Sequence, residues 1–381
     1  SRILETRAGR TTSDHLFEGG GALGAQVQLD LDVLGRGGVP STGVSAVVIN
    51  VTETNPTATG FITVWPTGST RPTASNLNFT PGTTVSNLVI VKIGSAGQIS
   101  LYNSAGSTDL VADVVGYFTD VSDLNSFTPT RMLDTRAGRT TFDHQFEGGG
   151  ALAAQTQVDL DLAARGPLPA AGTFGAVIMN VTATNPTAEG FVTVWPTGEI
   201  RPTASTLNFV AGQTIPNLIV GKVNGAGQVS LYNSAGSTDL IADVTAYFPS
   251  TSSDLSPLTP ARLLETRAGR TTVDGQFQAI GALPANAIFN LTVTGRGGVP
   301  ANATGAVVLN ITVTQPAAGG FLVAWPSSAT RPATSNINFA SGQTIANLAI
   351  VKIGTGGDIS LFNNASTDVV VDVVGYLPGA P

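Results

Sequence analysis

Hydrophobic and polar positions alternate with a period of two in short runs along the whole chain. In residues 26–33 every second residue is apolar, and glutamines and aspartates occupy the other positions. This is the pattern of a half-buried β-strand. Residues 45–53 are almost continuously apolar and β-branched, as in a strand that is covered on both faces. Turn signals containing glycine, proline or asparagine separate most of these runs, and we find no convincing amphipathic helix of ten or more residues.

The same pattern occurs three times. An arginine-rich segment, residues 2–10, returns at 131–139 and 262–270, and each repeat closes on an apolar run that contains an aspartate. These closing runs are residues 109–118, 239–248 and 368–377. The sequence therefore predicts three domains, at residues 1–118, 131–248 and 262–377. The segments between them, residues 119–130 and 249–261, are rich in Ser, Thr, Asp and Pro and are interpreted as linkers.

The fold class expected from these patterns is all-β. About seven or eight short strands per repeat, separated by turns, indicate an antiparallel β-sandwich. The repeat is too long for one propeller blade or one solenoid coil. We therefore expect three tandem β-sandwich domains of the jelly-roll or immunoglobulin-like type, joined by short Ser/Thr/Pro linkers.

Composition narrows the function classes. Only 11% of the residues are charged and 42% are hydrophobic, which is not the composition of a disordered chain. Cysteine is absent, so disulfides, thiolate metal sites and cysteine nucleophiles are excluded. The net charge of −7 without a basic stripe argues against nucleic-acid binding, and no apolar run is long enough to predict a membrane span. The chain starts directly on a repeat, as a processed or excised part of a longer secreted protein would.

The basic residues predict ion pairs. All 18 lie at positions that recur in the three repeats, and charges fixed in this way are expected to be paired or packed. Alternation puts Asp113 on the apolar face of its strand, where a buried carboxylate needs a cation. Arg7 is the first choice of partner and Arg2 the second, and an arginine pocket that binds a ligand is the alternative. The equivalent residues are Arg131, Arg136 and Asp243 in the second repeat and Arg262, Arg267 and Asp372 in the third.

Catalytic chemistry finds little support. Asp109 and Asp113 on one strand face would be about 13 Å apart, too far for a glycosidase pair, and calcium binding near Asp109 stays open. The chain has two histidines, His15 and His144, and Gly275 takes the equivalent place in the third repeat. A Ser–His–Asp triad would therefore be missing from one repeat, and a metal site of two or more histidines cannot form within any repeat. We expect no enzyme activity, no metal and no cofactor.

Two patterns leave a binding role open. Trp65, Trp195 and Trp325 each precede a proline, and Arg71, Arg201 and Arg331 follow six residues later. Exposed together, the tryptophan and arginine of each repeat could hold a sugar, and the alternative is that the tryptophans belong to the core. Asn50 begins a glycosylation triplet within a strand predicted to be buried, and we interpret it as a hydrogen-bonding strand residue.

Five motifs carry a resemblance to a known repeat. They lie at residues 2–9, 48–56, 60–66, 75–79 and 113–118 and recur in all three units. They resemble a repeat of secreted and cell-surface proteins of actinobacteria and related bacteria. The third unit departs mildly, with Gln315 before its proline and Leu377 at its end. The resemblance implies an extracellular or cell-surface setting and brings no assigned catalytic residues.

The function expected from the sequence is that of a non-enzymatic, extracellular structural or adhesive repeat protein. Repeated units that meet head to tail can continue into filaments, so the expected partners are other copies or neighbouring repeats of the same protein. The alternative is a multivalent, lectin-like module that binds cell-surface glycans with one weak site per repeat. The sequence leaves open the ligand, filament formation, the length of the parent protein and the orientation of the units.

Overall fold

The computed structural model describes residues 1–303 and 305–379, and in these residues the chain is built from β-strands and loops with two short 3₁₀ turns. The strands of the first repeat are β1 (Arg2–Glu5), β2 (Gln28–Asp32), β3 (Val44–Thr54), β4 (Gly60–Pro66), β5 (Leu77–Phe79), β6 (Thr84–Lys92), β7 (Gln98–Asn103) and β8 (Asp109–Thr119). Those of the second are β9 (Asn125–Asp134), β10 (Thr156–Asp161), β11 (Phe174–Thr184), β12 (Gly190–Pro196), β13 (Leu207–Phe209), β14 (Ile215–Lys222), β15 (Gln228–Asn233) and β16 (Asp239–Pro249). Those of the third are β17 (Ser256–Glu265), β18 (Ile288–Thr292), β19 (Ala306–Thr314), β20 (Gly320–Pro326), β21 (Ile337–Phe339), β22 (Ile345–Lys352), β23 (Asp358–Asn363) and β24 (Asp368–Leu377). The 3₁₀ turns are η1 (Ser95–Gly97) and η2 (Thr355–Gly357).

Each repeat contributes two small antiparallel sheets of four strands. In the first repeat the strand orders are β1-β8-β3-β6 and β2-β7-β4-β5, and the other two repeats follow the same orders. The chain passes back and forth between the two sheets of its repeat, so that neighbours in a sheet are distant in sequence. We call the sheet that contains the arginine segment blade A and the other sheet blade B.

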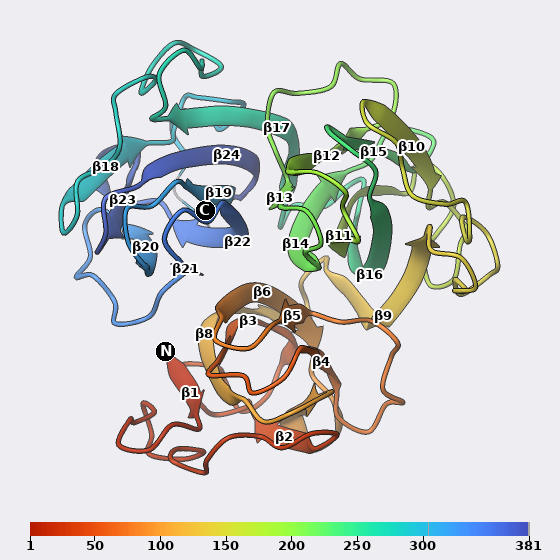
Figure 1. Ribbon diagram of the computed structural model, residues 1–381, viewed down its shortest axis with the longest axis vertical. Coiled ribbons are helices and arrows are strands. Elements are labelled where there is room, and N and C mark those ends of the chain that lie inside the picture. Colours follow the sequence, from red (N-terminus) through yellow and green to blue (C-terminus); the bar gives the residue numbers. More distant parts are fainter. Residues whose placement is uncertain (304, 380–381) are drawn as a thin grey trace.

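The six sheets form one closed ring, a six-bladed β-propeller (Figure 1). The inner strands β6, β14 and β22 contact one another at the centre. Each of the short strands β5, β13 and β21 contacts the inner strand of its own repeat and that of the next repeat. The last of these contacts, between β21 and β6, brings the third repeat back to the first.

The expectation of three tandem β-sandwich domains is therefore wrong. The length argument against a propeller assumed one blade per repeat, whereas each repeat supplies two. The apolar residues also cross the expected boundaries. One buried cluster contains residues of both the second and third repeats, and another contains residues of all three.

The expected linkers also have structure. The segment at 119–130 becomes the end of β8 and the beginning of β9, and the segment at 249–261 becomes the beginning of β17. Ser126 of β9 pairs with Ala246 of β16, and Pro257 of β17 pairs with Gly375 of β24. These segments are parts of blades, with no freely jointed stretch between the repeats.

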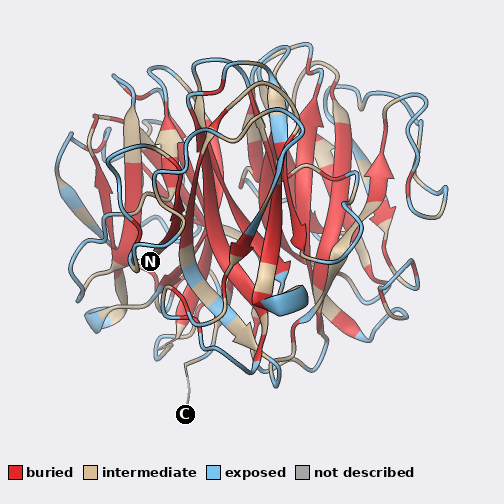
Figure 2. Cartoon of the chain, turned by 90° about the horizontal axis from the view of Figure 1, so that it is seen from below, coloured by how far each residue is buried: buried red, intermediate tan, exposed pale blue. Residues whose placement is uncertain are grey.

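Strand β3 shows why the core strands are apolar on both faces. Val47, Ile49 and Val51 pack inside the first repeat, between its two blades. Ala46 and Val48 point the other way, into a cluster at the centre of the ring. Seen from the side, the buried residues follow the strands and the exposed residues lie mainly on the loops (Figure 2).

Asparagines join the repeats at the centre of this apolar interior. Asn87, Asn217 and Asn347 lie on the three innermost strands and are buried. The backbone N–H of Leu218 donates to the side-chain oxygen of Asn87 over 3.1 Å. In the same way the N–H of Leu348 donates to Asn217, and that of Leu88 donates to Asn347. Each repeat thus accepts a hydrogen bond from the next, and the third accepts one from the first.

A second set of asparagines supports the first. Asn50, the residue interpreted as a strand hydrogen-bonding group, accepts a bond from the side chain of Asn347 over 3.1 Å and donates to the Ser335 carbonyl over 2.9 Å. Asn180 and Asn310 make the corresponding bonds at the other two junctions. Because each of these buried amides has a partner in another repeat, the central network favours only the assembled ring.

We predict that Asn87→Ala destabilises the whole ring. The substitution leaves the Leu218 N–H and the Asn180 side-chain oxygen without partners in a dry interior, and each unsatisfied group costs roughly 1–3 kcal/mol. Unfolding in urea, followed by tryptophan fluorescence, is expected to show one transition shifted to lower denaturant. The control is Asn78→Ala, which removes only a 3.1 Å bond to the Ser75 hydroxyl. Equal shifts for the two variants would contradict the central role of Asn87.

Candidate functional site

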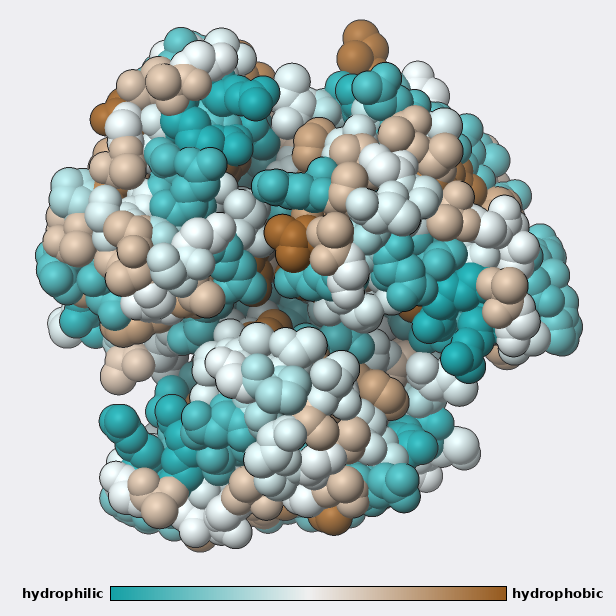
Figure 3. Space-filling view, in the orientation of Figure 1, coloured by the Kyte–Doolittle hydropathy of each residue, from teal (hydrophilic) through white to brown (hydrophobic). Residues whose placement is uncertain are grey.

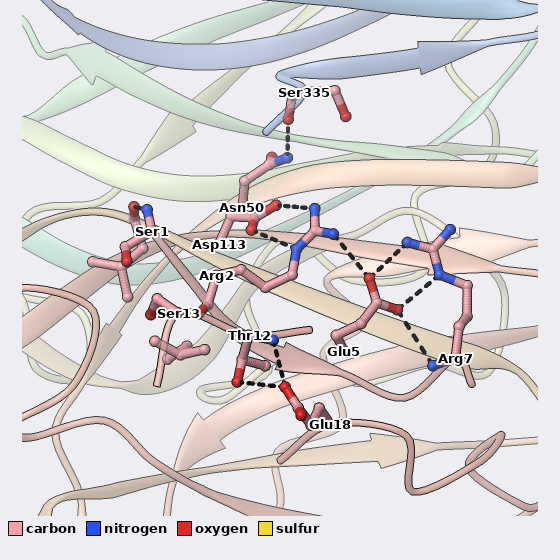
Figure 4. A network of polar contacts seen from close by, with 12 residues as sticks. Ser1, Arg2, Glu5, Arg7, Thr12, Ser13, Glu18, Asn50, Asp113 and Ser335 are labelled. Atoms are coloured by element: carbon pink, nitrogen blue, oxygen red, sulfur yellow. Dashed lines mark hydrogen bonds and ion pairs between the residues drawn. The ribbon is translucent and has the colours of Figure 1, made fainter. Parts of the chain in front are cut away.

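A cluster of two arginines and two carboxylates lies on the edge strand of each blade A and its neighbour, and Figure 4 shows the cluster of the first repeat. In the first repeat Arg2 makes a bidentate contact with Asp113, with distances of 3.0 and 3.2 Å from Nε and Nη2 to the two carboxylate oxygens. The other terminal nitrogen of Arg2 donates to Glu5 over 2.9 Å. Arg131 with Asp243 and Arg262 with Asp372 repeat the bidentate contact.

Arg7, the expected first choice, does not pair with Asp113. It contacts Glu5 through two hydrogen bonds of 2.7 Å, and Arg136 and Arg267 make the same contacts with Asp134 and Glu265. The reason is the strand register, in which Arg2 lies directly opposite Asp113 on β8. The acidic residue of the Arg-x-x-Glu/Asp motif is buried and forms the ion pair with the second arginine.

The burial of these clusters indicates that their role is structural. Asp113, Asp243 and Asp372 are at most 3% exposed, so the bidentate arginine compensates a carboxylate that is removed from water. Burial raises the pKa of Asp243 and Asp372 above the ordinary value, and the paired guanidinium opposes that effect. Burial also acts on Glu5, but the hydrogen bonds and charge of Arg7 dominate and leave its pKa below the ordinary value.

Sequence reasoning missed a second arginine site in each repeat. Arg36 is buried and donates from Nε and Nη2 to Asp14 over 2.7 and 3.0 Å. It also donates to backbone carbonyls, including that of Ile3 over 2.7 Å, so one guanidinium holds the long loop after β1 against its strand. The hydrogen bond from Arg36 lowers the pKa of Asp14 to about 2. The corresponding pairs are Arg165 with Asp143 and Arg296 with Asp274.

The first repeat contains one buried carboxyl without a cation. Glu53 on β3 is fully buried, and its Oε2 accepts a hydrogen bond from the Thr108 hydroxyl over 3.1 Å. Its Oε1 has no partner among the described residues. Burial raises the pKa of Glu53 to about 8. Ala183 and Val313 occupy the equivalent positions, so the acid is not a shared feature of the three repeats.

The two histidines have a local role. The ring of His15 is 3.3 Å from Glu18, and that of His144 is 3.2 Å from Glu147, on exposed loops. Within residues 1–303 and 305–379, no three His, Asp or Glu side chains are grouped so that they could hold a metal ion. Over the same residues, no helix is long and apolar enough to cross a membrane.

The tryptophans do not form a sugar-binding surface. Trp65, Trp195 and Trp325 are 2%, 3% and 4% exposed. Each indole N–H donates to a backbone carbonyl four residues later, and for Trp65 this is the carbonyl of Ser69 at 3.1 Å. The option of an exposed tryptophan that holds a sugar together with an arginine is therefore excluded, and the alternative, that the tryptophans are core residues, is confirmed.

The arginines that follow the tryptophans form a different surface. The guanidinium carbon of Arg71 lies 3.7 Å from the ring centre of Tyr102 on β7. Arg201 stacks on Tyr232 at 3.6 Å, and Arg331 stacks on Phe362 at 3.7 Å. All three arginines are exposed, and none is in an ion pair with a described carboxylate. We call these three stacked pairs the guanidinium platforms.

The surroundings of the platforms differ between repeats. In the antiparallel register Gln28 and Thr63 flank Tyr102, and Gln157 and Thr193 flank Tyr232. In the third repeat Ile288 and Val323 flank Phe362. Thr63, Thr193 and Val323 are buried, so the exposed neighbour of the platform is a glutamine in the first two repeats and the apolar Ile288 in the third. The repeated arginines gave the sequence signal for the platforms, but their aromatic partners were not recognised.

Comparisons with known proteins add little. No protein-family model and no curated protein sequence matches this chain. Among solved structures, "The Triple Jelly Roll Fold and Turret Assembly in an Archaeal Virus" is similar over 93% of this chain and 84% of the other, at 9% identity and a TM-score of 0.24. "Life in the extremes: atomic structure of Sulfolobus Turreted Icosahedral Virus" matches over 93% of this chain and 85% of the other, at 10% identity and a TM-score of 0.23. These scores are too low to support an argument about fold or function.

We predict that Glu53→Ala stabilises the protein at neutral pH. The wild-type carboxyl is protonated in the folded state up to a pH of about 8, whereas the unfolded chain loses that proton near pH 4.3. The contribution of Glu53 is therefore least unfavourable below pH 4.3, and it lowers the stability progressively as the pH rises toward 8. At pH 7 removal of this carboxyl relieves roughly 4 kcal/mol of that unfavourable contribution. Urea unfolding at pH 4 and pH 7 tests this, with the exposed Glu189→Ala as the control, and an equal effect of Glu53→Ala at both pH values would contradict it.

Proposed function

We propose that the protein is a non-enzymatic structural or adhesive module that acts outside the cell or at its surface. The observation that carries this proposal is the closed ring, which presents the same surface feature three times at fixed spacing. The repeats preserve a stacked, exposed guanidinium, whereas the histidines and the buried acid Glu53 are each absent from at least one repeat. Three copies of one weak contact suit attachment to a repetitive partner.

The ring changes how such a module would assemble. Head-to-tail contacts between repeats extend into filaments only when the rotation between them does not close. Here the contact between β21 and β6 completes the circle, so the repeat-to-repeat surfaces are already occupied within one chain. Attachment therefore has to use the outer surface. The face in Figure 3 is a mosaic of hydrophilic and weakly apolar patches without a broad hydrophobic area.

The guanidinium platforms favour an acidic glycan as the partner. A guanidinium that is held flat on a ring keeps its N–H groups directed outward, and it can donate two parallel hydrogen bonds to a carboxylate. Stacking on the aromatic ring stabilises the arginine position by about 0.5–1 kcal/mol at an exposed site. It therefore reduces the side-chain entropy that is lost on binding. In the first two repeats the exposed side chains of Gln28 and Gln157 lie beside the platforms, where an amide is placed to bond sugar hydroxyls.

We predict that the triple variant Arg71→Ala, Arg201→Ala, Arg331→Ala loses binding to immobilised polygalacturonate by at least about 100-fold, because avidity is lost together with the contacts. Each single substitution is expected to cost no more than about 10-fold. Surface plasmon resonance at low and physiological salt provides the measurement, with neutral dextran as the reference ligand.

The matched control is the triple variant Arg10→Ala, Arg139→Ala, Arg270→Ala. These arginines are also exposed and recur once per repeat, so the change in net charge is the same. If both triple variants lose binding equally, the effect is one of general charge and the platforms are not the site. Absence of wild-type binding to acidic glycans would remove the glycan form of the proposal.

A further inference from the structure

Three equivalent turns meet at one end of the ring. They join the short strands β5, β13 and β21 to the inner strands β6, β14 and β22, and they span residues 80–83, 210–214 and 340–344. Because the inner strands contact one another at the centre, their first residues gather around the axis of the ring. Thr83, Gln213 and Gln343, one residue from each turn, line a single cavity. We call this space the axial cavity, and it forms only when all three repeats are in place.

The axial cavity has the size and lining of a small-molecule site. Its volume is about 550 Å³, within the range of roughly 300–1,000 Å³ that is typical of ligand pockets. Phe79 and Val85 contribute buried apolar surface to its wall, and Phe61 also lines it and is 36% exposed. None of the described residues that line it is ionisable. The cavity therefore combines apolar surface with uncharged polar groups.

The two glutamines supply positioned hydrogen-bond donors. The side-chain oxygen of Gln213 accepts the N–H of Val210 over 3.0 Å, and that of Gln343 accepts the N–H of Ala340 over 2.8 Å. Each bond fixes the amide against its own turn. The Nε2 group of each glutamine donates to no described residue, so its N–H groups are available to a ligand.

The first repeat shows that the turn itself does not require a glutamine. Thr83 occupies the equivalent position, and its hydroxyl donates to the Thr80 carbonyl over 2.6 Å. A threonine therefore closes this turn through its own side chain, as the glutamines do in the other repeats. The longer side chains of the second and third repeats add an amide that the fold does not use.

A second cavity extends the first. It has a volume of about 520 Å³, lies between the third and first repeats, and shares Thr83 and Gln343 with the axial cavity. Phe321, the equivalent of Phe61, lines it. Arg7 also lines it, but the charge of this arginine is compensated by its ion pair with Glu5. The two cavities together place one phenylalanine on each side of the shared polar residues.

We propose that the axial cavity and its extension bind a neutral, β-linked oligosaccharide. A β-linked pyranose with equatorial hydroxyls has C–H faces that pack on an aromatic ring, and its hydroxyls exchange hydrogen bonds with amides and threonines. A neutral sugar is favoured over an acidic one, because a carboxylate would find no cation among the residues that line the axial cavity. The inference does not rest on the guanidinium platforms, and the triple variant of Arg71, Arg201 and Arg331 is expected to retain this binding.

Isothermal titration calorimetry with cellotriose, xylotriose and triacetylchitotriose tests the proposal. At least one of these sugars is expected to bind at one site per chain, with a Kd between about 10 μM and 1 mM. The Kd is expected to be the same at low and physiological salt, because the ligand carries no charge. Saturation-transfer NMR on the unmodified protein is expected to label the C–H protons of the bound sugar when the aromatic protons of the protein are irradiated.

A double variant, Gln213→Thr with Gln343→Thr, locates the binding. It gives the second and third repeats the residue that closes the turn in the first repeat, so the fold is expected to be retained while both amide donors are lost. Binding is expected to weaken by at least about 10-fold. Gln145→Thr is the matched control, because Gln145 is exposed on a loop of the second repeat and lines neither cavity. Urea unfolding checks that the variants are folded.

Three results would overturn the proposal. The first is that none of the three sugars binds at about 10 mM. The second is that the double variant binds as tightly as Gln145→Thr. The third is that the triple arginine variant loses the neutral sugar, which would place the binding at the platforms. Failure of the protein to bind polygalacturonate would leave this inference intact.

Discussion

The fold depends on three buried asparagine side chains that pass a hydrogen bond from one repeat to the next around the centre. Asn87, Asn217 and Asn347 each accept a backbone N–H from the innermost strand of the next repeat. A buried amide without partners is costly. In an isolated repeat these side chains would be exposed to water or left without hydrogen-bond partners. The apolar cluster around them supplies much of the driving force for folding, but hydrophobic contacts are not directional. The asparagine hydrogen bonds are directional and fix the register between repeats.

The arginines illustrate how one residue type serves three purposes. Arg2 compensates a buried aspartate, Arg36 holds a long loop through carbonyl groups, and Arg71 stays exposed on an aromatic ring. The first two are removed from ligands by their partners. Only the third combines exposure, a rigid position and the lack of a described ion-pair partner, and for this reason it carries the proposed attachment surface.

Much of the local structure could be predicted from the sequence, but the arrangement of the sheets could not. The period of two located most strands, and the aspartate within an apolar run indicated a buried carboxylate with an arginine near it. The choice between Arg2 and Arg7 depended on a strand register that spacing alone does not determine. The ring depended on contacts between strands of different repeats, such as β21 with β6, which leave no periodic signal in either strand. The sequence left Trp65 open between a binding role and the core, because a tryptophan before a proline can be either exposed or buried, and the structure places it in the core.

The circuit of asparagines also sets how many repeats can belong to one ring. Each repeat offers one acceptor and one donor to its neighbours, and both are used when the third repeat meets the first. A fourth repeat inserted into the chain would have to widen the angle at every junction, and the innermost strands would separate around an enlarged centre. A longer array would therefore grow by duplication of whole rings, with three repeats as the unit that is duplicated.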